Sequence, residues 1–241
     1  MKKALLFIAL ATLMTACGSK SPKDSPAVSD AISTFQNEPG DSALYGLACD
    51  GCTDSILVFL PYSGGDPDTF DIINARQQHR VLGRPHIGDA LAVILNPENR
   101  TEALTIINMS TLEGQWCYMV EPTLRTHDGA MPDSIRKKIL QPVEYSLKLK
   151  ADNTATMTGY RRNTTGRSQS LAVYPDVHRY TEWRLYNGRL ILHADTIAGF
   201  TQEGEVPVTD TAEIVSLRRD SLILRLGDKE QKFYRKKEGK M

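Results

Sequence analysis

The sequence carries no excess of charge of either sign, because its 29 basic and 29 acidic side chains cancel over 241 residues. Proteins that attract nucleic acid or anionic surfaces through their overall field need a basic excess, so this balance argues against a nucleic-acid-binding protein. After residue 16 the chain also has no apolar run of the roughly 20 residues that a membrane-spanning helix requires. Any attachment of this part of the chain to a membrane must therefore rely on something other than a spanning helix.

Motifs of catalysis are missing as well. The five histidines occur singly, and the sequence contains no Gly-x-Ser-x-Gly turn and no phosphate-binding loop. His178 and Glu182 are a candidate acid–base pair across a barrel mouth, although an ordinary surface pair is the simpler interpretation. We therefore expect a protein that is not an enzyme and holds no cofactor.

The first 16 residues have the pattern of a secretory signal peptide. Lys2 and Lys3 precede an apolar run over residues 4–14, which is too short to span a membrane, and a small residue, Ala16, stands before Cys17. The ending Met14-Thr15-Ala16-Cys17 resembles the lipobox of bacterial lipoproteins. The resemblance implies that Cys17 is acylated, with palmitate among its chains, and becomes the mature N-terminus.

Residues 17–42 contain little apolar surface and predict a flexible tether. Two or more acyl chains give stable anchoring. Gly18 stands where many inner-membrane lipoproteins carry Asp, so we expect a lipid anchor in the outer membrane that faces the periplasm. Display at the cell surface stays open as the alternative.

Residues 43–109 predict a small all-β module. Short apolar runs alternate with Gly-, Pro- and Asn-rich turns, a pattern typical of an antiparallel sheet or small barrel. Five strands in this length favour an antiparallel barrel of the OB-like or SH3-like kind. The expected strands are residues 55–60, 70–75, 79–82, 90–95 and 103–108.

Residues 110–237 predict a second, larger barrel, followed by a tail at 238–241. Asn187-Gly188 is a strong signal for a two-residue hairpin, and residues 132–140 could form one brief helix. Gly114-Gln115-Trp116 resembles the entry of lipocalin-like domains. The resemblance implies an up-and-down barrel that Trp116 seals at one end, with Arg235 of the last strand packed over the indole.

A barrel of eight strands has just enough interior for one small molecule. We therefore expect a small apolar ligand, although each aromatic residue of the barrel could equally fill the core. The candidate lining residues are Trp116, Tyr118, Tyr160, Trp183 and Tyr186.

Cys49-Asp50-Gly51-Cys52 is the one compact chemical motif, and it leaves several interpretations open. The two cysteines could form a structural disulfide in an oxidising compartment, exchange electrons, or bind copper or zinc. Cys117 is then an odd thiol, which could be a small buried side chain or pair with Cys49 or Cys52. A metal site would need further ligands, for which the candidates are Cys117, Met109, Met119, His79 and His86.

The region around Cys49 and Cys52 is similar to the Cys-x-x-Cys entry of NlpE-type envelope-stress lipoproteins, although Ala48 stands where that family usually has Pro. The resemblance implies a sensor of redox state or copper. The sequence thus favours an outer-membrane lipoprotein that binds a small apolar ligand or serves as a non-catalytic envelope component with a protein partner. The alternative is an NlpE-like sensor that acts through Cys49 and Cys52.

Overall fold

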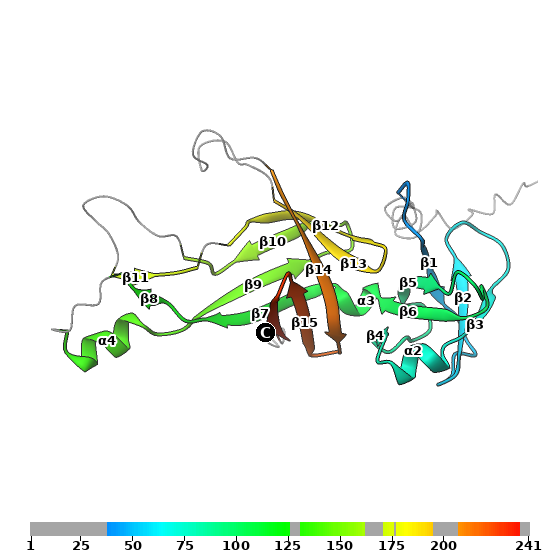
Figure 1. The fold of residues 1–241 in the computed structure, drawn as a ribbon, viewed down its shortest axis with the longest axis horizontal. Helices are drawn as coiled ribbons and strands as arrows, with labels where there is room; N and C mark the ends of the chain where they lie inside the picture. Colours follow the sequence, from blue (N-terminus) through cyan, green and yellow to red (C-terminus); the bar gives the residue numbers. More distant parts are fainter. Residues whose placement is uncertain (1–37, 126–130, 162–170, 176, 195–206, 237–241) are drawn as a thin grey trace, which may run out of the picture.

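The computed structural model describes residues 38–125, 131–161, 171–175, 177–194 and 207–236. The predicted signal peptide, Cys17, most of the predicted tether and the predicted tail lie outside these residues. Within them, no helix is long and apolar enough to cross a bilayer. Two β-structures follow one another along an elongated molecule (Figure 1).

The first structure is a six-stranded sheet in the order β3-β2-β1-β5-β6-β4. All neighbouring pairs are antiparallel except β4 and β6, which run parallel. The sheet curls, so that Asp71 at the end of β3 forms a bridge with Glu102 just before β6. Its strands are β1 (Ala43–Ala48), β2 (Ile56–Pro61), β3 (Asp68–Asp71), β4 (Val81–Leu82), β5 (Ala90–Leu95) and β6 (Ala103–Asn108).

The strand predicted over residues 70–75 is wrong in its second half, because α2 (Ile73–Gln77) forms there. The carboxylate of Asp71 accepts a hydrogen bond of 2.8 Å from the backbone N–H of Ile73, which turns the chain out of β3. Ile72 and Ala75 are then both buried, at the spacing of one helical turn. A short apolar run fits a strand or a helix equally well before its packing is known.

The second structure is an antiparallel barrel of eight strands in the order β10-β9-β7-β16-β15-β14-β13-β12. Each strand of the barrel therefore lies beside the barrel strands that precede and follow it in the sequence, as predicted for an up-and-down barrel. The ring nearly closes between β10 and β12, where Thr154 bridges Glu182. Its strands are β7 (Gly114–Val120), β9 (Val143–Leu149), β10 (Ala155–Thr158), β12 (Tyr180–Tyr186), β13 (Arg189–Ala194), β14 (Val208–Leu217), β15 (Ser221–Leu226) and β16 (Lys229–Arg235).

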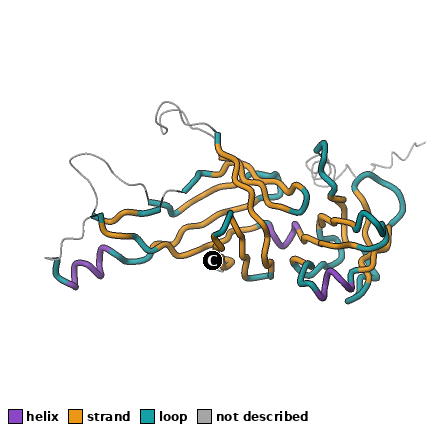
Figure 2. The backbone as a smooth tube through the Cα atoms, in the orientation of Figure 1, coloured by secondary structure: helices purple, strands orange, loops and turns teal. Residues whose placement is uncertain are grey.

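Smaller elements complete the fold (Figure 2). The predicted helix over residues 132–140 is present as α4 (Asp133–Ile139), beside a two-stranded sheet of β8 (Thr123–Leu124) and β11 (Ala172–Val173). These three elements extend from the barrel on the side away from the first sheet (Figure 1). The predicted hairpin is also confirmed: Asn187 and Gly188 have φ of 49° and 73° and join β12 to β13.

The base of the barrel is sealed as the lipocalin resemblance implies. Trp116 is fully buried, and its indole N–H donates to the carbonyl of Leu112 at 2.6 Å. The Arg235 guanidinium lies 4.3 Å from the indole centroid and donates to the carbonyls of Glu113, at 2.9 Å, and Thr111. Gly114 makes room for this arginine, because a Cβ there would lie 2.4 Å from the guanidinium.

The first sheet and the barrel share one hydrophobic core. The short helix α3 (Met109–Leu112) links them, and its Met109 and Leu112 are fully buried. Tyr45 and Ile107 of the first sheet belong to the same cluster of buried residues as the interior of the barrel. The base of the barrel is therefore covered by the first sheet, and its other end faces away from it.

We predict that Trp116→Ala lowers the free energy of unfolding by about 3–5 kcal/mol, the usual cost of deleting a large buried aromatic side chain. Met119→Ala on the same strand is the matched control, because Met119 is 52% exposed and its loss should cost less than about 0.5 kcal/mol. Denaturant unfolding of both variants measures the difference. Equal effects of the two substitutions would contradict the sealing role of Trp116.

Candidate ligand site at the barrel mouth

Along the barrel axis, the interior goes from fully buried side chains at the base to a mixture of buried and partly buried side chains at the other end. Trp116, Leu147 and Leu222 near the base are at most 2% exposed. At the end away from the first sheet, the interior side chains pack on this core but stay only partly buried; they are Tyr118, Met157, Tyr180 and Leu226. We call this end, together with Asp210, the barrel mouth.

Tyr118 is the centre of an aromatic cluster in the mouth. Its ring meets the rings of Phe233 and Tyr145 edge-on, with centroid distances of 5.1 Å and 5.7 Å. Such contacts fix the orientation of the rings. Burial, followed by the influence of Tyr145, raises the pKa of Tyr118 to about 12. Its hydroxyl is therefore neutral at physiological pH and can donate or accept one hydrogen bond.

A carboxylate completes the mouth. Oδ2 of Asp210 accepts a hydrogen bond from the Tyr180 hydroxyl at 2.5 Å and lies 2.7 Å from Nδ1 of His178. Burial, and then the hydrogen bond to Asp210, raises the pKa of Tyr180 well above its ordinary value, so Tyr180 remains a donor. His178 also meets Tyr180 edge-on, with a centroid distance of 6.3 Å.

This arrangement leaves one side of the carboxylate available. Within the described residues, both side-chain contacts fall on Oδ2 of Asp210 and none on Oδ1. The Asp210 side chain is 24% exposed and that of His178 is 48% exposed. The mouth therefore combines partly buried apolar side chains with a partly exposed carboxylate.

The five aromatic residues that the sequence suggested as lining of a ligand cavity lie in different parts of the barrel. Trp116 and Trp183 are 0% and 1% exposed, and the indole of Trp183 donates to the carbonyl of Lys150 at 2.8 Å, so both fill the core. The hydroxyl of Tyr186 donates to the carbonyl of Pro39 at 3.3 Å, on the side of the first sheet. Tyr160 is partly buried just after β10, and Tyr118 lies in the mouth.

Sequence reasoning missed Tyr180, Met157 and Asp210. The sequence signal for Asp210 was its position in β14. Alternate residues of a strand face the same side, so Asp210 points inward with the buried residues Ala212 and Ile214. The predicted pair of His178 with Glu182 is replaced by His178 with Asp210, which lies 32 residues away in the sequence.

The three described cysteines are free thiols. Sγ of Cys52 lies 3.2 Å from the carbonyl oxygen of Cys49 and accepts a hydrogen bond from the backbone N–H of Val58 at 3.4 Å. Cys117 is fully buried in β7, and burial raises the pKa of its thiol. The interpretations of Cys49 and Cys52 as a disulfide or redox pair therefore stay predictions.

The candidate metal ligands are spread through the fold. Met109 is buried in the shared core, Met119 is exposed on β7, and His86 pairs with Asp89 at 3.3 Å. Among the residues that the structure describes, no group of three or more His, Cys, Asp and Glu side chains is placed to hold a metal ion.

Comparison with protein-family models supports the assignment of the barrel. A protein-family model described as lipocalin-like matches residues 165–237. One solved structure, of a lipocalin-like protein from Bacteroides thetaiotaomicron, is 19% identical, with 52% of this chain and 95% of that chain covered and a TM-score of 0.30. No curated protein matches the chain. The chain thus contains a lipocalin-like domain, matched over the second half of its eight-stranded barrel.

Proposed function

We propose that this protein is a non-catalytic binding protein whose barrel takes up one small, mostly apolar molecule through the mouth. The observation that carries the proposal is the change along the barrel axis. A fully buried base gives way to a mouth where the partly buried side chains of Tyr118, Met157, Tyr180 and Leu226 lie at the same end of the barrel as the carboxylate of Asp210. Pockets for small molecules commonly combine an apolar wall with a few placed polar groups.

The chemistry of the mouth defines the class of ligand. Tyr118, Met157 and Leu226 offer apolar and aromatic surface to a hydrocarbon body. Oδ1 of Asp210 offers a charged acceptor, which favours a ligand head that donates a hydrogen bond, such as a hydroxyl or an ammonium group. A free carboxylate head would meet repulsion from Asp210. We therefore propose an amphiphile with a donor head, and not a fatty acid, as the ligand.

We also propose that Cys17 is acylated and anchors the protein in the outer membrane, facing the periplasm. The support is the lipobox-like sequence Met14-Thr15-Ala16-Cys17 after a signal-like segment. An anchor of this kind would place the barrel beside a source of amphiphiles.

The first test blocks the mouth. We predict that Leu226→Trp raises the Kd for the neutral fluorescent probe N-phenyl-1-naphthylamine at least tenfold, because the added ring occupies the space that the probe would enter. Ile223→Trp is the matched control: it lies on the same strand with its side chain on the opposite face, and it should bind as the unmodified protein does. Fluorescence titration of the full chain measures both. Unchanged binding by Leu226→Trp would exclude the mouth as the site.

The second test concerns the acceptor. We predict that Asp210→Asn weakens displacement of the probe by decylamine about tenfold, since a hydrogen bond to a charged partner is worth about 1.5–3 kcal/mol. Displacement by decanol should change less than threefold, because the amide oxygen still accepts a hydrogen bond. Asp228→Asn, in the exposed turn between β15 and β16, is the control for charge. A decylamine affinity unaffected by Asp210→Asn would contradict the proposed role of the carboxylate.

The third test concerns the anchor. In a Gram-negative host supplied with an alkynyl palmitate, the protein should incorporate the label and sediment with membranes, whereas Cys17→Ser should lose the label. Gel fluorescence of both proteins measures the incorporation. Equal labelling of the two would refute acylation at Cys17.

A further inference from the structure

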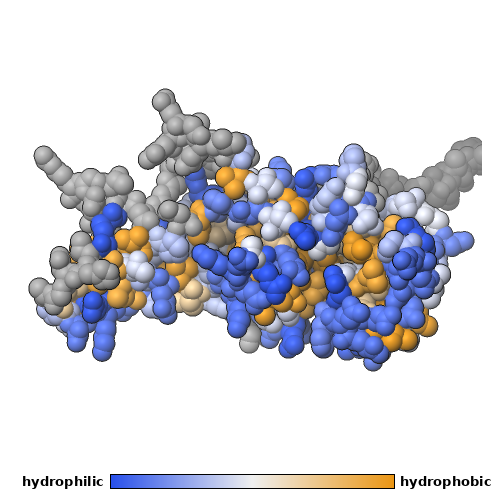
Figure 3. Space-filling model, in the orientation of Figure 1, coloured by the Kyte–Doolittle hydropathy of each residue, from blue (hydrophilic) through white to orange (hydrophobic). Residues whose placement is uncertain are grey.

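A cleft of about 750 Å³ lies between the first sheet and the barrel, at the end of the barrel opposite the mouth. One wall comes from α2, β4 and the turn after β4, and the other comes from the end of β14 and the turn into β15. The volume is in the range of sites for small molecules. Hydrophilic residues cover the lower part of this face of the molecule, over α2 and around the turn between β14 and β15 (Figure 3).

The cleft is strongly basic although the chain as a whole is neutral. Four arginines contribute to its lining: Arg76, Arg84, Arg218 and Arg219. Asp54 is the carboxylate of the lining, and it pairs with Arg76 at 2.8 Å. Among the described residues, the other three guanidinium groups form no ion pair. Arg84 on one wall and Arg218 and Arg219 on the other therefore carry positive charge that no described carboxylate neutralises.

The floor of the cleft is fixed by the backbone. The N–H of Gly83 donates to the carbonyl of Leu217 at 3.0 Å, which joins the two walls directly. Gly83 has φ of +80°, and a Cβ there would lie 2.8 Å from Cβ of Asn108, so only glycine fits. The two walls therefore meet at a position that cannot accept a side chain.

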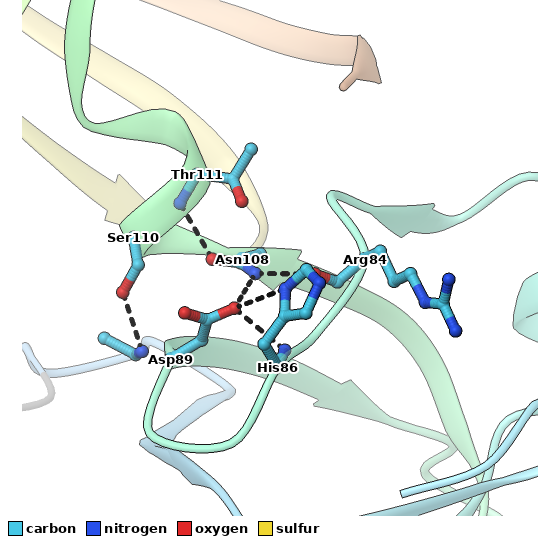
Figure 4. A network of polar contacts seen from close by, with 7 residues as sticks. Arg84, His86, Asp89, Asn108, Ser110 and Thr111 are labelled. Carbon is cyan, nitrogen blue, oxygen red and sulfur yellow. Dashed lines mark hydrogen bonds and ion pairs between the residues drawn. The ribbon is translucent and has the colours of Figure 1, made fainter. Parts of the chain in front are cut away.

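Asn108 fixes the backbone of Arg84, the residue after Gly83. Fully buried at the end of β6, it donates from Nδ2 to the carbonyl of Arg84 at 3.0 Å and to Oδ2 of Asp89 at 2.6 Å. In Figure 4 the guanidinium of Arg84 points away from this network. The hydrogen bond that fixes the Arg84 backbone therefore does not involve its guanidinium group. On the same wall, Nε of Arg76 is buried and has no hydrogen-bond partner. This wall thus presents the guanidinium of Arg84, without an ion pair among the described residues, on a backbone that Asn108 fixes.

We propose that this cleft binds an anion with more than one phosphate group, held between Arg84 on one wall and Arg218 and Arg219 on the other. Planar guanidinium groups match phosphate oxygens with paired hydrogen bonds. A cleft of about 750 Å³ has room for a diphosphate or a bisphosphorylated head group, whose several phosphate oxygens can pair with arginines of both walls. The ligand would be either a soluble phosphorylated molecule or the head group of a lipid.

The soluble arm titrates the purified full chain with inorganic pyrophosphate by calorimetry. Arg84→Gln and Arg219→Gln, one from each wall, should each raise the Kd about fivefold to tenfold. Arg225→Gln on β15 removes the same charge outside the cleft, from a side chain already paired with Glu213 and Glu230, and should leave the Kd unchanged. The three variants should unfold at the temperature of the unmodified protein.

The lipid arm measures sedimentation with phosphatidylcholine vesicles that contain or lack cardiolipin, whose head group carries two phosphates. The lysines of the N-terminal segment favour the anionic vesicles equally in every variant, so the part of the cardiolipin-dependent gain that the cleft variants lose reports the cleft. A cardiolipin-dependent gain that Arg84→Gln and Arg219→Gln abolish would identify a lipid head group as the ligand. Pyrophosphate binding with the same dependence and no such gain would identify a soluble molecule. Equal effects of Arg225→Gln and the cleft variants, or no binding in either arm, would overturn the proposal.

Discussion

The apolar core that continues from the first sheet into the barrel is the constraint on which the rest of the structure depends. The hydroxyl of Tyr45 lies 2.7 Å from Oδ2 of Asp41 and 3.1 Å from the carbonyl oxygen of Leu185, so it joins the first strand to the barrel inside this core. Asn187 donates its backbone N–H to Oδ1 of Asp41 at 2.9 Å, and a Cβ on Gly188 would lie 3.4 Å from Ile94. The hairpin between β12 and β13 is thereby fixed against the first sheet. Because this packing covers one end of the barrel, ligand access is expected at the other.

The two candidate sites are related through one strand. β14 begins in the mouth, where Asp210 contacts Tyr180 and His178, and ends in the basic cleft at Leu217 (Figure 1). The sites differ in chemistry, since the mouth is apolar with one acceptor and the cleft is a set of guanidinium donors. An amphiphile with a donor head suits the first, and a phosphorylated anion suits the second. Neither site uses Cys49, Cys52 or Cys117.

Much of the fold could be predicted from local sequence signals. Asn187-Gly188 requires positive φ at two successive positions, and Gly114-Gln115-Trp116 places a large ring at the entry of a barrel, so both could be identified without long-range contacts. The parallel pairing of β4 with β6 could not, because a strand of two residues, although expected within residues 79–82, carries no signal for its partner or direction. The mouth was also beyond prediction, since Asp210 meets His178 and Tyr180 only through the register of β12, β13 and β14. The cleft depends in the same way on the docking of two separate structures.

The most direct test of the central claim, that the barrel holds a small molecule, is a mass comparison of the protein recovered from a periplasm, under native and denaturing conditions. We predict an additional mass in the native spectrum, one ligand per chain, that is lost on denaturation. The ligand extracted from this complex should be an amphiphile with a hydroxyl or amine head. Identical native and denatured masses, together with no uptake of added decylamine or decanol, would contradict the account and assign the barrel a purely structural role.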